Sequence, residues 1–189
     1  MALTRSKEPL VWIDCEMTGL DPESDHIIQI SCFITDYNLE LLEPNGFHVT
    51  IHQPQHVLSA MNPWCISTHA RSGLTAAVLA STTTPIDATD ALLTYIRTYV
   101  PESGKALLAG NTVHMDRAFL ARQPYKRVIE WLHYRILDVS SVKESIRRWA
   151  ADEVLQDIPE KKGLHLAKED ILESIQEMKF YRDRVFYAH

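Results

Sequence analysis

Two carboxylates stand one residue apart at the end of an apolar segment. Residues 10–13 are continuously apolar, which is typical of a strand buried on both faces, and Asp14 and Glu16 follow directly. Because side chains alternate across a strand, both carboxylates face one side and Cys15 faces the other. Two such charges repel each other and lose hydration, and a divalent cation with oxygen ligands would offset both effects. The pair alone is also compatible with a strand that runs out into solvent.

Two further acidic residues and a histidine stand near the ends of predicted elements. Asp116 follows the fourth predicted strand, Asp170 lies in the first turn of the last predicted helix, and His165 precedes that helix. Sites in α/β sheets gather at the carboxyl ends of central strands, so these residues could join the first pair. Taken singly, each has an alternative: Asp116 as a solvated helix residue, Asp170 as a partner of the helix dipole, and His165 as a surface loop residue.

Hydrophobic periodicity predicts three strands followed by alternating helices and strands. The second and third strands are predicted at 26–35 and 47–52, with the Asn45 and Gly46 pair supplying the turn chemistry of an antiparallel meander. The later elements are a helix from Thr84 to about 100, a strand at 106–109, a helix through 116–120, a strand at 133–139, a helix from Ser141 to about 150 and a last helix from about 167. We expect a connector at 61–73 and a mobile loop at 152–163. This order predicts an α/β fold with a mixed sheet flanked by helices.

Length and composition predict a single intracellular domain. The 189 residues, 46% of them hydrophobic, are enough for one domain over residues 1–189, with residues 1–8 as a flexible tail. Three cysteines without metal-site spacing are predicted to be buried and reduced. No apolar targeting or membrane-spanning segment stands out, so we expect neither secretion nor a membrane. The net charge of −6 argues against a protein that coats long nucleic acid, but not against a small nucleic-acid substrate.

The motifs, taken together, resemble those of a known enzyme family. Asp14-x-Glu16, Asn111-x-x-x-x-Asp116 and the block from His165 to Asp170 resemble the three motifs of the DEDDh 3′-to-5′ exonucleases, which share an RNase H-like fold. Within that superfamily, the blocks at 12–21, 72–74, 110–111 and 133–140 are similar to the oligoribonuclease family over almost the whole chain. The sequence departs from that family's pattern at Gln29, Thr112, Lys168 and Glu169. None of these is among the five central motif residues, which are Asp14, Glu16, Asp116, His165 and Asp170.

The resemblance implies a metal-dependent exoribonuclease that degrades short oligoribonucleotides to nucleoside 5′-monophosphates. By resemblance, Asp14 would bridge two Mg²⁺ or Mn²⁺ ions, Glu16 and Asp170 would complete the site of one, and Asp116 would support the other. Two ions about 3.5–4 Å apart can stabilise both the attacking and the leaving oxygen of a phosphodiester. His165 would be the general base, because the ordinary pKa of histidine suits proton transfer near neutral pH.

The resemblance also implies roles in binding short single-stranded RNA. Leu20 would be a wedge between terminal bases, Trp64 a stacking platform, and Tyr134 a residue that reaches the site of the second subunit in a homodimer. A cap on the 5′ phosphate would consist of His69, Thr112, Arg135 and Ser140. For Trp64 a core position, and for Tyr134 an ordinary strand position, remain alternatives.

Two other functions are weighed against this one. A DEDDh exonuclease that trims or proofreads longer RNA or DNA 3′ ends would be expected to carry a basic track, which this acidic chain lacks. A non-catalytic scaffold that binds RNA ends has no need for carboxylates that repel phosphate. The sequence therefore favours the short-RNA exonuclease, in the cytoplasm or the mitochondrion.

Overall fold

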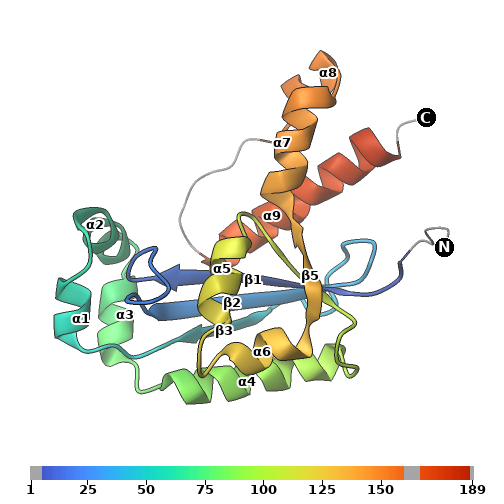
Figure 1. Cartoon of the computed structure of the whole chain (residues 1–189). Coiled ribbons are helices and arrows are strands. Elements are labelled where there is room, and N and C mark those ends of the chain that lie inside the picture. Colours follow the sequence, from blue (N-terminus) through green and yellow to red (C-terminus); the bar gives the residue numbers. More distant parts are fainter. Residues whose placement is uncertain (1–5, 160–166, 188–189) are drawn as a thin grey trace.

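A five-stranded mixed sheet forms the centre of the fold (Figure 1), and the computed structural model describes residues 6–159 and 167–187. In chain order the strands are β1 (Leu10–Met17), β2 (Ile27–Thr35), β3 (Phe47–Thr50), β4 (Leu107–Gly110) and β5 (His133–Asp138). The order across the sheet is β3-β2-β1-β4-β5. β1, β2 and β3 pair antiparallel, whereas β4 and β5 run parallel to β1. The predicted meander and mixed α/β sheet are therefore confirmed.

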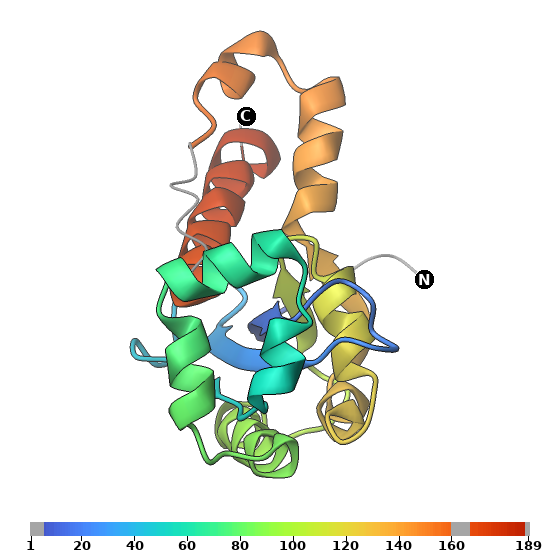
Figure 2. The same ribbon diagram turned by 90° about the vertical axis from the view of Figure 1, so that its left-hand side faces the viewer.

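Helices cover both faces and one end of this sheet (Figures 1 and 2). They are α1 (Gln55–Ser59), α2 (Pro63–Arg71), α3 (Leu74–Ala80), α4 (Pro85–Tyr99), α5 (His114–Leu120), α6 (Lys126–Trp131), α7 (Val139–Trp149), α8 (Asp152–Gln156), α9 (Ala167–Tyr181) and the π-helical turn η1 (Arg182–Phe186). Helices α4 and α6 lie on one face, α7 and α9 lie on the other, and α1 to α3 gather beside the carboxyl end of β1.

Side-chain alternation along β1 divides the core between the two faces. Val11 and Ile13 pack with α4 and α6, whereas Trp12 packs with α7 and α9. All three side chains are buried. Asp14 and Glu16 follow Trp12 at intervals of two residues, so they face the side of the sheet on which α9 lies.

The expectation of a connector at 61–73 is wrong, because residues Pro63–Arg71 form helix α2. Asn62 starts this helix: its side-chain oxygen accepts a hydrogen bond from the backbone nitrogen of Cys65 at 2.9 Å. Pro63 occupies the first helical position, where its missing N–H is not needed.

Two predictions in the last third of the chain also need correction. The helix predicted from Ser141 begins at Val139, because Asp138 caps it by accepting a hydrogen bond from the backbone nitrogen of Ser140 at 2.9 Å. The loop predicted at 152–163 contains helix α8, and its residues 160–163 lie outside the described part of the chain.

The predicted start of the helix at Thr84 and the predicted burial of the cysteines are confirmed. Thr84 and Asp87 form the capping box of α4, with each side chain accepting a hydrogen bond from the other's backbone nitrogen at 3.2 Å. All three cysteines are buried and free. Among the described residues, none of the helices has the length and apolar character needed to cross a membrane. The predicted N-terminal tail falls mostly on residues 1–5, outside the described residues.

Candidate active site

Three carboxylates from two distant parts of the chain meet at the end of β1. One carboxylate oxygen from each of Asp14, Glu16 and Asp170 lies within 4.8 Å of the other two. The packing of Trp12 against α9 explains this meeting, because it places the first turn of α9, which carries Asp170, on the face where the β1 carboxylates point. The structure therefore brings three of the predicted residues together.

The electrostatics of this carboxylate cluster favour a bound cation. Glu16 has a side-chain exposure of 18%. Burial, followed by the negative charges of Asp170 and Asp116, raises the pKa of Glu16 from 4.5 to about 7. The ligand atoms are all carboxylate oxygens, which suit hard divalent cations such as Mg²⁺ and Mn²⁺. The donor set at Asp14, Glu16 and Asp170 therefore fits a metal site.

Asp116, the fourth predicted carboxylate, lies close by but is held differently. Its side chain is 6% exposed, and its Oδ1 accepts a hydrogen bond from the backbone nitrogen of Cys15 at 2.9 Å. Burial raises the pKa of Asp116 to about 7, although the hydrogen bond from Cys15 opposes this shift. The structure thus brings three of the four carboxylates into one group and anchors the fourth to the backbone of β1.

Next to the carboxylates is an open pocket of about 510 Å³. Glu16 lines it together with Leu20 and Trp64, two apolar side chains that are 74% and 60% exposed. Leu20 comes from the turn after β1 and Trp64 from the first turn of α2. Exposed apolar side chains that line a cavity suit a flat aromatic ligand, and the predicted wedge and platform line the same pocket.

His69, a buried residue of α2, also lines this pocket. Its Nε2 lies 3.0 Å from the backbone oxygen of Met17, which can only accept, so Nε2 is the donor. Its Nδ1 lies 4.0 Å from Oε2 of Glu16. Burial lowers the pKa of His69, which favours the neutral ring. The structure therefore places His69 with Leu20 and Trp64, beside the carboxylate cluster.

A second group of predicted residues lies where the turn after β4 meets the first turn of α7. The backbone nitrogen of Thr112 donates to Asp138 Oδ1 at 3.0 Å and to Ser140 Oγ at 2.9 Å. The hydroxyl groups of Thr112 and Ser140 lie 3.1 Å apart. Thr112 and Ser140, both predicted to bind the 5′ phosphate, are thus held together.

Tyr134 and Arg135 lie on β5, an edge strand of the sheet. The Arg135 guanidinium carbon lies 4.7 Å from the centroid of the Tyr134 ring, and the His133 ring stacks on the same tyrosine at 4.5 Å. Tyr134 is 68% exposed and belongs to strand β5, so the structure is compatible both with an ordinary exposed strand residue and with one that reaches a second subunit. His165, the predicted base, lies outside the described residues.

Two residues in this region were not singled out from the sequence. Asp138 is the acceptor that holds both Thr112 and Ser140, and the Asp-x-Ser spacing of a helix cap was its sequence signal. Ser174, on α9, accepts a hydrogen bond from Asn111, which lies 63 positions earlier in the sequence. No local sequence pattern predicts such a contact.

Comparison with known proteins identifies the class of this chain. An exonuclease family model, RNase T, matches residues 11–178. A structure of exonuclease I superposes on 96% of this chain with a TM-score of 0.70 at 14% identity. A metal-free complex of Escherichia coli exonuclease I with single-stranded DNA superposes on 96% with a TM-score of 0.67 at 15% identity. These matches cover 42% and 41% of those chains and show the RNase H-like fold alone.

Closer relatives narrow the class. The mitochondrial oligoribonuclease of Saccharomyces cerevisiae is 45% identical over 186 residues, which are 95% of this chain and 68% of that protein. The oligoribonuclease of Vibrio cholerae is 45% identical over 181 residues, with 96% and 97% covered. The mitochondrial oligoribonuclease of Bos taurus is 45% identical over 177 residues, with 94% and 73% covered. The chain belongs to the oligoribonuclease family of exonucleases. It is accordingly a 3′-to-5′ exonuclease, a phosphodiester hydrolase that degrades short oligoribonucleotides.

Proposed function

We propose that Asp14, Glu16, Asp116 and Asp170 hold two divalent ions, Mg²⁺ or Mn²⁺, at which this chain cleaves single nucleotides from the 3′ end of short RNA. The observation that carries this proposal is the approach of three carboxylates within 4.8 Å beside an open pocket. Bound ions would supply stabilisation of the charge on the attacking and leaving oxygens. His165 would take the proton of the attacking water, a role that rests on the family motif.

The 3′-terminal base would occupy the pocket between Leu20 and Trp64. Both side chains are exposed and apolar, and Glu16 lines the same pocket, so a base held there would bring its phosphate to the carboxylate cluster. Stacking on an aromatic ring tolerates every base, which suits an enzyme that degrades RNA of any sequence. His69 would fix the inner wall through its hydrogen bond to Met17.

The 5′ phosphate would bind at a second place, formed by Thr112, Arg135 and Ser140, whereas His69, which the family resemblance also assigns to this cap, lies in the pocket with Leu20 and Trp64. Arg135 supplies a guanidinium that can bind phosphate with two hydrogen bonds. Because the protein is acidic, with a net charge of −6, a long RNA backbone gains little from it. Binding energy would then come from the two ends of a substrate of about two to five nucleotides.

A second copy of this chain would complete each site, which makes the enzyme a homodimer. Tyr134 supports this proposal, since it projects from an edge strand with 68% of its surface exposed and Arg135 stacked on it. The three buried free thiols support an intracellular location, either cytoplasmic or mitochondrial.

The direct test uses a pentaribonucleotide labelled at one end, Mg²⁺ and a time course. We expect a 3′ label to leave at once as a mononucleotide, whereas a 5′ label should pass through successively shorter products. Chelation of Mg²⁺ should stop both reactions. Internal fragments, or undiminished hydrolysis in chelator, would contradict the proposal.

A pair of variants locates the metal in the same assay. Asp170→Asn should reduce hydrolysis on the order of a hundredfold or more, because it removes a ligand charge from the carboxylate cluster. The matched control is Glu169→Gln, which removes the neighbouring charge in the same first turn of α9 and should leave the rate within about twofold.

A further inference from the structure

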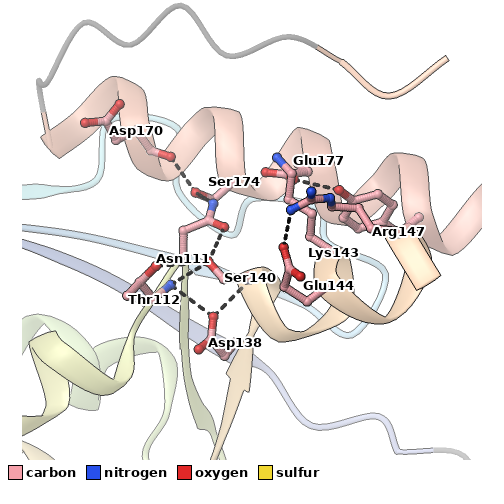
Figure 3. Close-up of polar contacts among 11 residues, drawn as sticks. Asn111, Thr112, Asp138, Ser140, Lys143, Glu144, Arg147, Asp170, Ser174 and Glu177 are labelled. Carbon is pink, nitrogen blue, oxygen red and sulfur yellow. Dashed lines mark hydrogen bonds and ion pairs between the residues drawn. The ribbon is translucent and has the colours of Figure 1, made fainter. Parts of the chain in front are cut away.

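A continuous chain of hydrogen bonds connects the turn after β4 to the first turn of α9 (Figure 3). The backbone nitrogen of Thr112 donates to Ser140 Oγ at 2.9 Å, and Ser140 Oγ donates to Asn111 Oδ1 at 3.1 Å. Asn111 Nδ2 donates to Ser174 Oγ at 2.5 Å, and Ser174 Oγ donates to the backbone oxygen of Asp170 at 2.6 Å. The chain thus joins a proposed phosphate-binding turn to a proposed metal ligand.

The direction of every bond in this chain follows from its last member. The backbone oxygen of Asp170 can only accept a hydrogen bond, so Ser174 donates its single hydroxyl proton to it. Ser174 must then accept the hydrogen bond from Asn111. The amide of Asn111 therefore turns its NH₂ group toward Ser174 and its oxygen toward Ser140. Ser140 then gives its own proton to Asn111, and the Thr112 hydroxyl is left as the donor in its contact with Ser140.

The directions of these hydrogen bonds give the hydroxyl groups of Ser140 and Thr112 different roles. Ser140 already accepts from Thr112 and donates to Asn111, so its role in the chain is to hold both neighbours. The Thr112 hydroxyl can rotate toward a phosphate oxygen without breaking the chain, because Ser140 keeps its bond from the Thr112 backbone. Thr112 is therefore the member of the hydrogen-bond chain that would contact a bound phosphate.

The backbone of Thr112 shows that this turn is held firmly. Its φ of +53° lies in the left-handed region, which is rare for a β-branched residue. Such a conformation persists where the surroundings over-determine it, and here Asp138 and Ser140 both accept from the Thr112 nitrogen. Ser174, at the other end, is 3% exposed, so water does not compete for its bonds.

We propose that Asn111 is a positioning residue that, with Ser174, fixes the spacing between the 5′-phosphate site and Asp170. This inference rests on the proposed function, in which the shortest substrates are held at both ends. A dinucleotide has no slack, so a displacement of about 1 Å between its two anchoring points can reduce its rate on the order of a hundredfold. A pentanucleotide can absorb the same displacement by bending. The bridge at Asn111 would thus set the preference for the shortest RNA.

The test compares kcat/KM for a 5′-phosphorylated dinucleotide and a 5′-phosphorylated pentanucleotide at saturating Mn²⁺. Ser174→Ala removes the acceptor for Asn111 and should lower the ratio of dinucleotide to pentanucleotide by about tenfold. Asn111→Leu should lower this ratio to the same extent. Ser174→Thr keeps the hydroxyl group and should restore most of the ratio.

The matched control is Thr94→Ala on α4. Thr94 donates to the backbone oxygen of Asp90 at 2.7 Å, the same type of bond within a helix that lies on the other face of the sheet. This variant should leave the ratio unchanged. Thermal melting of each variant shows that it is folded, and Ser174→Ala, which removes one oxygen, carries the test if Asn111→Leu does not fold.

Calorimetric titration with Mn²⁺ separates spacing from metal loss. The affinity of Ser174→Ala for Mn²⁺ should fall by about tenfold at most. The rate ratio is measured at Mn²⁺ saturation, so this loss of affinity does not affect it. If both substrates lose rate equally, or if neither loses any, the inference is wrong. The proposed function would fail differently, through a wild-type protein that hydrolyses neither substrate or ignores the 5′ phosphate.

Discussion

At the residue scale, the site concentrates negative charge where water is scarce. Glu16 shows the effect most clearly, because burial and the charges of Asp170 and Asp116 all raise its pKa, to about 7. A folded protein that holds protons in this way is less stable when they leave. Without a cation, the carboxylate cluster therefore opposes folding at neutral pH, and a bound cation reverses that effect.

This reasoning predicts the pH dependence of the metal-free protein. The unfolded chain releases the Glu16 proton near 4.5, and the folded protein keeps it to about 7, so the free energy of unfolding contributed by Glu16 falls as the pH rises through this window. Relative to Glu16→Gln, wild type should lose on the order of 2 kcal/mol between pH 5 and 8 in chelator. Urea titrations of both proteins measure the difference.

The comparison with Glu16→Gln is needed because His69 acts in the opposite sense. Burial lowers the pKa of His69, so its contribution rises with pH through the ordinary histidine range and is nearly the same in both proteins. Added Mg²⁺ should abolish the fall. If the free energy of unfolding of wild type, measured relative to Glu16→Gln, stays constant or rises with pH, this account of Glu16 is wrong.

At the element scale, the long periodic segments were predictable, whereas most of the short helices were not. The buried strand ending at Asp14 and Glu16, the capped helix α4 and the apolar face of α9 each show a full repeat in the sequence. Helices α1 to α3, α6 and α8 have five to nine residues, too few for periodicity to decide. For α2 the signal existed, in the Asn62 and Pro63 pair that starts it.

The candidate site divides in the same way. The carboxylates were predictable because strand alternation places Asp14 and Glu16 together and the family motif points to Asp170. The bonds of Asn111 and Asp138 were not, because Asn111 contacts Ser174 only after α9 packs on the sheet, and Asp138 contacts Thr112 only after β4 and β5 pair. Long-range hydrogen bonds of single polar groups leave no periodic trace in a sequence.

Helix α2 offers an element-scale prediction through Trp64. Trp64→Ala should lower kcat/KM for a short oligoribonucleotide by about tenfold, since stacking of one base contributes roughly 1–3 kcal/mol. The control is Ile66→Ala, which removes another exposed apolar side chain of α2, one that is 41% exposed, and should change kcat/KM by less than about twofold. Equal effects of the two variants would show that α2 supplies no specific base platform.

At the scale of the whole molecule, the proposed homodimer makes a prediction about mixed subunits. Tyr134→Ala and Asp14→Ala proteins should each be nearly inactive, because one lacks the residue that completes its neighbour's site and the other lacks a metal ligand. After mixing and subunit exchange, heterodimers with one intact site should regain part of the activity. A fully active monomer in sedimentation at the assay concentration would rule this arrangement out.

The central claim is that an acidic molecule recognises short RNA by its two ends, and kcat/KM along a ladder of 5′-phosphorylated oligoribonucleotides tests it most directly. For wild type, kcat/KM should be greatest at about two to five nucleotides. Arg135→Ala should lower it most for the dinucleotide, by roughly the 1.5–3 kcal/mol of a charge-assisted hydrogen bond. Equal values for a dinucleotide and a twenty-residue RNA, unaffected by Arg135→Ala, would contradict recognition by the two ends.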